Sequence, residues 1–211
     1  MTGRERRYFF HRISGFLSSM LSIVFWLMLI FGFEELSIAI FTVIAAVIHE
    51  LGHLVYLKLS GADYSLRGVL SGFRIKPHAT MSYKEEMLLF LAGPTANIVC
   101  ALVLLMFIPF CPIFFIEFMF INLITALSNL LPIEGYDGYG AIMAFIRQRE
   151  DGEKHESALR GLSCLLIILL CIFSLYFIDR FGGGYWVFGI FLISIVKELS
   201  KGLSKVKNVD L

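Results

Sequence analysis

Charged residues are scarce in this chain. Only 17% of its 211 residues are Asp, Glu, Lys or Arg, whereas 58% are hydrophobic, and the mean hydropathy is +0.80. Soluble globular domains carry about 25% charged residues, so the composition excludes that class. The net charge is +1, which gives no reason to expect a nucleic-acid partner. The chain is therefore expected to cross a membrane several times.

The sequence also lacks closely spaced cysteines. Its four cysteines form no Cys-x-x-Cys pair and mostly fall in apolar stretches. We interpret them as small packing residues rather than as disulfide partners or metal ligands. No Ala-x-Ala-type cleavage site follows the first apolar stretch, so this stretch is predicted to be an uncleaved span rather than a secretory signal.

Long apolar stretches predict an all-α polytopic protein with about six transmembrane helices. A spanning helix needs about 20 residues, and the first four stretches are close to that length. Basic residues cluster before the first stretch, between the second and third, between the fourth and fifth, and after the last. The positive-inside rule then places both termini in the cytoplasm of a multi-pass protein of the cell membrane. The predicted spans are 13–33, 36–59, 87–108, 113–131, 162–178 and 181–196.

Residues 49–53, with the sequence His-Glu-Leu-Gly-His, lie inside the second predicted span. An uncompensated acidic side chain near the centre of a spanning helix costs about 2.5–3.5 kcal/mol, so a compensating group is expected. On a helix, His49 and His53 lie about 40° apart around the axis and roughly 6 Å along it, which allows both to bind one metal ion. This HExxH pattern is typical of zinc hydrolases, in which Glu50 would be the general base. The alternative is a chance match whose polar groups bond to one another.

The segment 60–83 is polar enough to leave the membrane. Residues 73–76 alternate apolar with basic side chains, and Gly68 and Gly72 are expected to bound a hairpin. The segment therefore predicts a small β-hairpin or sheet on the cytoplasmic side. Its edge could pair with an extended substrate, because strand addition uses the backbone. An ordinary connecting hairpin explains the same pattern equally well. His78 has no spaced partner and is interpreted as a solvated residue.

The third span contains Gly93, Pro94 and Asn97. Pro94 removes a backbone donor and Gly93 permits close approach of another helix, so a kink packed against a neighbour is expected. Asn97 could form a hydrogen bond across that contact. We interpret all three residues as structural.

The fourth apolar stretch continues into a turn with Pro132 and three glycines, followed by further apolar residues up to 146. The segment 113–146 therefore predicts a helix that is broken at membrane depth, where irregular backbone must be buried in protein or line a wet cavity. Asp137 is then placed to be the third metal ligand, which leaves the fourth position for water. Alternatively, Asp137 is a turn residue at the membrane surface. Glu134 is a less favoured rival ligand.

With these motifs in this order, the chain resembles the site-2 protease family of intramembrane zinc metalloproteases. The resemblance implies a Zn²⁺ ion bound by His49, His53 and Asp137. It further implies that Glu50 is the general base and that Asn129 lies near the substrate. The matches are the HExxH motif at 49–53, the Gly-Pro-x-x-Asn at 93–97, and an Asn-x-x-Pro followed by Asp-Gly at Asn129, Pro132, Asp137 and Gly138.

The six-span layout resembles the subgroup that includes the stage IV sporulation protease, but two features differ. Members of that subgroup usually carry a cytoplasmic CBS domain after the last span, whereas none is expected here, and no PDZ domain is expected either. Residues 1–211 are therefore predicted to form a single transmembrane metalloprotease domain without a soluble regulatory domain. Residues 135–139 read Gly-Tyr-Asp-Gly-Tyr where the family usually has Pro-Leu-Asp-Gly-Gly. The two tyrosines could alter substrate selection.

The sequence thus predicts a protease that hydrolyses a peptide bond in or near a transmembrane segment of a membrane-protein substrate, towards the cytoplasmic side. The expected partners are the lipid bilayer, a single-span or membrane-associated substrate, and a membrane inhibitor or regulatory protein. Two alternatives stay open. A metal-ion transporter also uses intramembrane His, Glu and Asp, but with several sites and often inverted repeats. An inactive protease-like scaffold is the other alternative.

Overall fold

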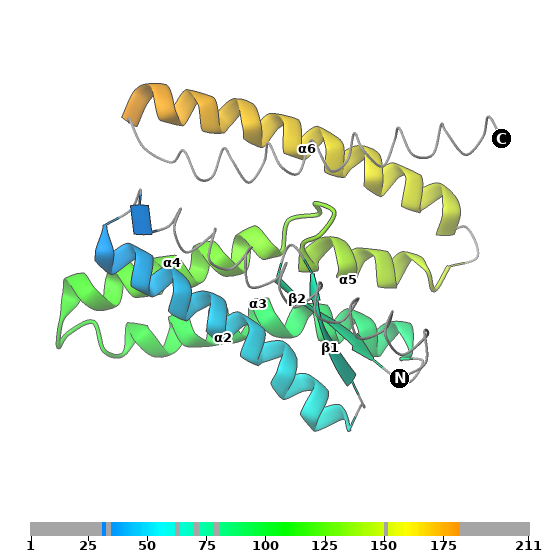
Figure 1. Cartoon of the computed structure of the whole chain (residues 1–211), viewed down its shortest axis with the longest axis horizontal. Helices are drawn as coiled ribbons and strands as arrows, with labels where there is room; N and C mark the ends of the chain where they lie inside the picture. The colour runs from blue at the N-terminus through cyan, green and yellow to red at the C-terminus, as the bar shows by residue number, and fades with distance from the viewer. Residues whose placement is uncertain are drawn as a thin grey trace, which may run out of the picture.

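Five helices and one β-hairpin make up most of the part of the chain that the structure describes. The computed structural model describes residues 31–32, 35–61, 64–69, 72–77, 81–149 and 152–181. Figure 1 shows the arrangement of these elements. In chain order they are α2 (Leu36–Ser60), β1 (Tyr64–Val69), β2 (Gly72–Pro77), α3 (Tyr83–Leu105), α4 (Pro112–Asn129), α5 (Asp137–Ile146) and α6 (Gly152–Phe181).

Four of these helices are long and apolar enough to cross a membrane. They are α2, α3, α4 and residues Lys154–Arg180 of α6. The chain is therefore a multi-pass membrane protein, as its composition predicts. The first and sixth predicted spans, 13–33 and 181–196, lie outside the described residues except at 31–32 and 181.

The helix α3 occupies the centre of the bundle and packs against α2, α4 and α5. Small residues allow the backbones to approach closely, as is usual between membrane helices. Ala45 on α2 and Ala126 on α4 are both completely buried. Gly52 on α2 faces the carbonyl oxygen of Ala92 so closely that a Cβ there would be 2.6 Å from it. The bundle is thus tight where α2 crosses α3.

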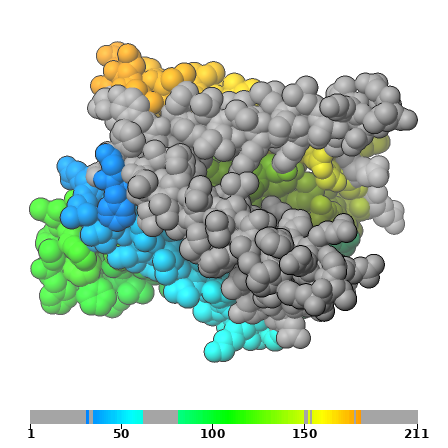
Figure 2. Space-filling view, in the orientation of Figure 1, coloured from blue at the N-terminus to red at the C-terminus, as the bar shows by residue number. Residues whose placement is uncertain are grey.

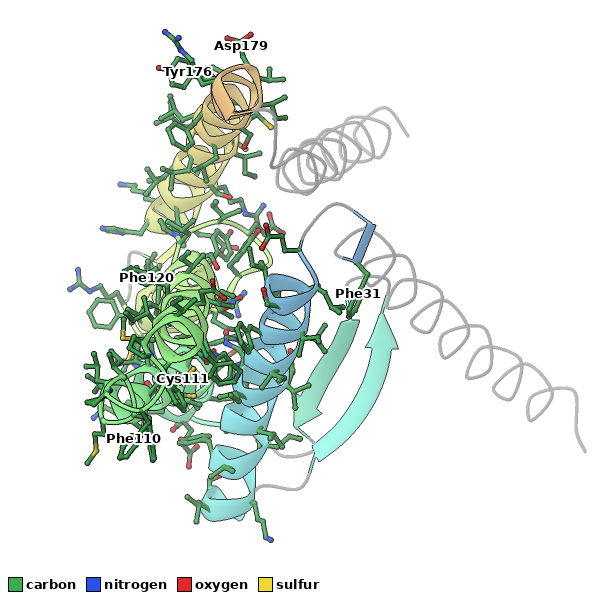
Figure 3. All side chains as sticks on the ribbon, turned by 90° about the vertical axis from the view of Figure 1, so that its left-hand side faces the viewer. Phe31, Phe110, Cys111, Phe120, Tyr176 and Asp179 are labelled. Carbon is green, nitrogen blue, oxygen red and sulfur yellow. The ribbon has the colours of Figure 1, made fainter. Side chains whose placement is uncertain are left out.

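The bundle carries apolar side chains outside and amides inside. Leu102 and Leu127 are 58% and 63% exposed, whereas Asn97 and Asn122 are 0% exposed. This distribution suits a lipid solvent, in which exposed leucine is favourable and a polar group needs an internal partner. Figure 3 shows Phe110 and Phe120 directed away from the helices. The space-filling view shows the α3 and α4 end of the bundle beside the first turns of α2 (Figure 2).

The segment between α2 and α3 contains the β-hairpin that the sequence predicts. The strands β1 and β2 pair antiparallel, from Tyr64 opposite Pro77 to Val69 opposite Gly72. Gly72 begins the second strand as expected, but Gly68 lies within the first strand, opposite Phe73, and does not bound it. Figure 3 shows the hairpin on the side of α2 opposite to α4.

The helices that flank the hairpin have well-defined ends. Gly61 ends α2 in the left-handed conformation, with φ of 65°, and its N–H donates to the carbonyl oxygens of Leu57 and Lys58. Ser82 and Glu85 form a capping box at the start of α3, in which each side chain accepts a hydrogen bond from the other residue's backbone N–H. The helix α3 continues through Pro94 as a single element, so Pro94 does not end it.

Residues 130–136 interrupt the apolar segment after α4. Ile133 is completely buried there, and the N–H of Glu134 donates to Ser163 Oγ on α6 at 2.8 Å. Gly135 has a φ of 102°, a conformation that favours glycine. Gly138 lies against the carbonyl group of Leu130, where no Cβ would fit. These contacts set the direction of α5, whose first residue is Asp137.

The helix α6 packs on α5 through a small apolar cluster. Tyr139 and Met143 on α5 are buried against Leu159 on α6, with Ile146 beside them. Tyr139, one of the two tyrosines that the sequence suggests for substrate selection, is therefore a packing residue between two helices. Figure 1 shows α6 on one side of the molecule, with α5 between it and α3.

Replacing Ile133 with alanine should destabilise the connection that carries Asp137. Truncation of a fully buried isoleucine costs about 2–5 kcal/mol, and the thermal midpoint in detergent should fall accordingly. Ile124→Ala is the matched control, because Ile124 on α4 is 62% exposed. Equal losses of stability in both variants would contradict the packing described for residues 130–136.

Candidate metal centre

Three side chains from two helices converge at one point inside the bundle. His49 and His53 lie on the same face of α2, and Asp137 is the first residue of α5. Asp137 Oδ2 is 2.8 Å from His49 Nε2 and 3.2 Å from His53 Nε2, and the two Nε2 atoms are 3.3 Å apart. Both histidines are buried, at 6% and 7% exposure. The three residues form a group that could hold a metal ion.

The hydrogen bonds on the far side of each ring determine where its proton lies. His53 Nδ1 is 2.8 Å from the backbone oxygen of Leu89, which can only accept. In the neutral ring, Nδ1 of His53 therefore carries the proton, and its Nε2 has a free lone pair. His49 Nδ1 is 2.9 Å from Asn97 Oδ1, which also only accepts. Both rings thus present an unprotonated Nε2 to Asp137.

When both rings are neutral, the converging atoms are three acceptors without a proton among them. The polar partners of the buried Oδ2 of Asp137 are the two ring nitrogens themselves, and no other hydrogen bond to it is found among the described residues. An added proton on one ring would satisfy one of the three contacts and leave the other lone pairs facing each other, whereas a divalent cation would satisfy all three. Tetrahedral zinc with bonds of about 2.0–2.2 Å has ligand atoms roughly 3.3 Å apart. Two of the three observed separations are close to this value and one is shorter.

Gly93 on α3 keeps the space beside these atoms free. A Cβ at Gly93 would lie in contact with Nε2 of both His49 and His53, well inside van der Waals distance. The sequence motif that contains Gly93 predicts close packing of two helices. The structure shows that it also leaves room for the group that the two rings face. The donor set, the protonation pattern and this space all fit a zinc ion.

Glu50 is an exposed residue on α2, between the two histidines in sequence. It is outside the group formed by His49, His53 and Asp137, and its role as general base stays a prediction. Asn129 ends α4, and its Nδ2 donates to the Thr125 carbonyl oxygen at 2.9 Å. Its expected contact with a substrate stays a prediction. Among the described residues, the carboxylate that meets the two rings is that of Asp137, and Glu134 is outside this group.

Two asparagines contribute more to this site than the sequence suggests. Asn97 forms hydrogen bonds across a helix contact, as expected. Its Nδ2 donates to the backbone oxygen of Ala45, but its Oδ1 accepts from the ring of His49. Asn122, which the sequence reading did not single out, bonds to Asn97 from α4. The signal that could have identified Asn122 is an amide within an otherwise apolar span, since such residues need a partner.

The described fold has a counterpart among solved structures. It matches the structure of the site-2 protease from Methanocaldococcus jannaschii with a TM-score of 0.61, over 84% of both chains, at 19% sequence identity. The fold is that of a site-2 protease. No family model matches the sequence, and no curated protein matches it. The likeness lies in the arrangement of the helices, which brings the two histidines and the aspartate together.

Zinc should stabilise the protein, and filling the space at Gly93 should abolish this effect. A ligand present at 100 times its Kd adds about 2.7 kcal/mol to the free energy of unfolding. Zinc added to chelator-treated wild type should therefore raise its thermal midpoint. Gly93→Ala should show no such rise, because its methyl group would displace the ring nitrogens. Gly161→Ala, whose Cβ would meet no atom within 4 Å, should respond like the wild type. A full zinc response in Gly93→Ala would contradict the proposed position of the ion.

Proposed function

We propose that this chain is an intramembrane zinc metalloprotease. The convergence of His49, His53 and Asp137 as three proton-free acceptors carries the proposal. Two of them belong to an HExxH motif, and the helices have a site-2 protease fold. Three protein ligands leave the fourth position of a tetrahedral ion for water, as in catalytic rather than structural zinc sites.

Each residue of the site then has a defined task. Zinc, when bound, would lower the pKa of water and polarise the peptide carbonyl group. His49 and His53 hold their lone pairs inward because Asn97 and Leu89 accept their Nδ1 protons. Glu50 takes a proton from the attacking water and returns it to the leaving amine, so that one carboxylate serves as base and then as acid.

The proposed substrate is a membrane protein with a single span or a membrane-associated segment. The peptide carbonyls of an intact helix are occupied by hydrogen bonds, so the substrate must unwind locally before hydrolysis. Asn129 is proposed to line its path. The clusters of basic residues support a six-span layout with both termini in the cytoplasm and cleavage towards that side. The subgroup of the stage IV sporulation protease has the corresponding layout.

The variant Glu50→Gln separates this function from metal transport and from an inactive scaffold. It keeps the size and hydrogen-bonding capacity of residue 50 but cannot accept the proton. Purified wild type should bind about one zinc ion and cleave single-span substrates in detergent. Glu50→Gln should retain zinc, whereas its kcat should fall by about 100-fold or more, the scale of general acid and base catalysis.

Three other outcomes would contradict the proposal. Cleavage by Glu50→Gln at the wild-type rate would exclude Glu50 as the base. Zinc flux into vesicles that persists in Glu50→Gln would favour a transporter. Zinc binding without cleavage of any of the substrates by the wild type would favour a scaffold. Ile124→Ala is the matched control and should cleave substrate like the wild type, because Ile124 is exposed on α4.

A further inference from the structure

We infer that Asn122 is a positioning residue for the metal centre, which it affects through Asn97 and His49. The inference rests on the proposed function. Asn122 lies on α4 and is completely buried. Its Nδ2 donates to the carbonyl oxygen of Phe118 at 2.9 Å, and its Oδ1 accepts from Asn97 Nδ2 at 3.0 Å. Asn122 contacts no metal ligand directly, so any effect on the ion must pass through Asn97.

The two asparagines form a chain of hydrogen bonds with one direction. The Phe118 carbonyl oxygen only accepts, so Nδ2 of Asn122 must face it and Oδ1 must face Asn97. Asn97 Nδ2 then donates one proton to Asn122 Oδ1 and the other to the Ala45 carbonyl oxygen at 2.9 Å. Oδ1 of Asn97 is the atom left for His49. Each link therefore fixes the next.

The last link decides the protonation of a metal ligand. Since Asn97 offers an acceptor to His49 Nδ1, the ring keeps its proton there and its Nε2 lone pair points at Asp137. A flipped Asn97 amide would offer a donor instead and favour the opposite tautomer. Two acceptors on Asn97 Nδ2 hold the amide against this flip, and Asn122 supplies one of them. Partners of this kind typically affect metal affinity 10–100-fold.

The chain of hydrogen bonds crosses three helices and ends on the one that carries the two histidine ligands. It runs from Asn122 on α4 through Asn97 on α3 to His49 on α2. The hydroxyl groups of other polar residues in these helices differ in this respect. Thr125 on α4 and Thr42 on α2 donate to carbonyl groups one turn back in their own helices. Asn122 is thus connected to the site, whereas Thr125, three residues further on the same helix, is not.

A structural role alone would give a different result from a positioning role. A hydrogen bond that only joins two helices would change the unfolding temperature of the zinc-free protein and leave the zinc affinity of the folded protein unchanged. A positioning role changes the zinc affinity itself. It also makes the effect of Asn122 depend on the presence of Asn97, because Asn97 is the only proposed route to the ion.

The test is a double-mutant cycle on zinc affinity, measured by competition with a chelator in the purified full chain. Asn122→Ala should weaken zinc binding about 2–10-fold, the equivalent of one neutral hydrogen bond. Asn97→Ala should weaken it about 10–100-fold. The double variant should bind zinc as Asn97→Ala does, because the two residues act in series. Thr125→Val, the matched control on α4, should bind zinc like the wild type.

A conservative variant completes the test and covers the case in which Asn122→Ala does not fold. A protonated aspartic acid at this buried position can donate to the Phe118 carbonyl oxygen and accept from Asn97, so Asn122→Asp should keep nearly wild-type zinc affinity. Unchanged zinc affinity in Asn122→Ala would overturn the inference. Equal losses of zinc affinity in Asn122→Ala and Asn122→Asp would also overturn it. So would a loss of zinc affinity on adding Asn122→Ala to Asn97→Ala that equals the loss caused by Asn122→Ala in the wild type. A wild type that binds no zinc would overturn the proposed function and the inference together.

Discussion

The structure depends on one contact that is unfavourable between neutral rings and an ionised carboxylate when no cation is present, the meeting of three lone pairs. His49, His53 and Asp137 bring these lone pairs to within 2.8–3.3 Å of one another inside an apolar bundle. Such an arrangement is costly unless a cation is present, because buried polar groups without a partner are destabilising. The hydrogen bonds to Asn97 and Leu89 prevent the simplest escape, which is a change of tautomer. The surrounding fold therefore maintains a site for a positive charge.

The helices around this site are arranged to hold it. The central helix α3 contributes a glycine that leaves the space open, a backbone oxygen that orients His53, and an amide that orients His49. The helix α4 supplies the second amide, and its irregular continuation turns Asp137 back towards α2. Apolar side chains cover the outside of these helices, where lipid rather than water is the solvent. The two histidines and the two amides are thereby confined to the interior.

Much of this arrangement follows from the sequence, and the remainder has identifiable reasons. The apolar stretches predict four helices that the structure contains, and the HExxH spacing places His49 and His53 on one helical face. The sequence predicts Asp137 as the third metal ligand because Pro132 and the nearby glycines cannot continue a helix, which breaks the segment at membrane depth. The hydrogen bonds of Asn97 and Asn122 depend on how three helices are rotated against each other, which periodicity does not encode. The packing of Tyr139 against α6 likewise depends on tertiary contacts.

The central claim is that two imidazoles and one carboxylate bind zinc at this point. X-ray absorption at the zinc edge of the purified, zinc-loaded protein tests it most directly. The account predicts a first shell of only nitrogen and oxygen at about 2.0–2.2 Å, with outer-shell scattering from two imidazole rings. In Asp137→Ala the signal of both rings should persist while the first shell loses one oxygen or gains water. A sulfur ligand at about 2.3 Å, or a first shell without imidazole, would contradict the account.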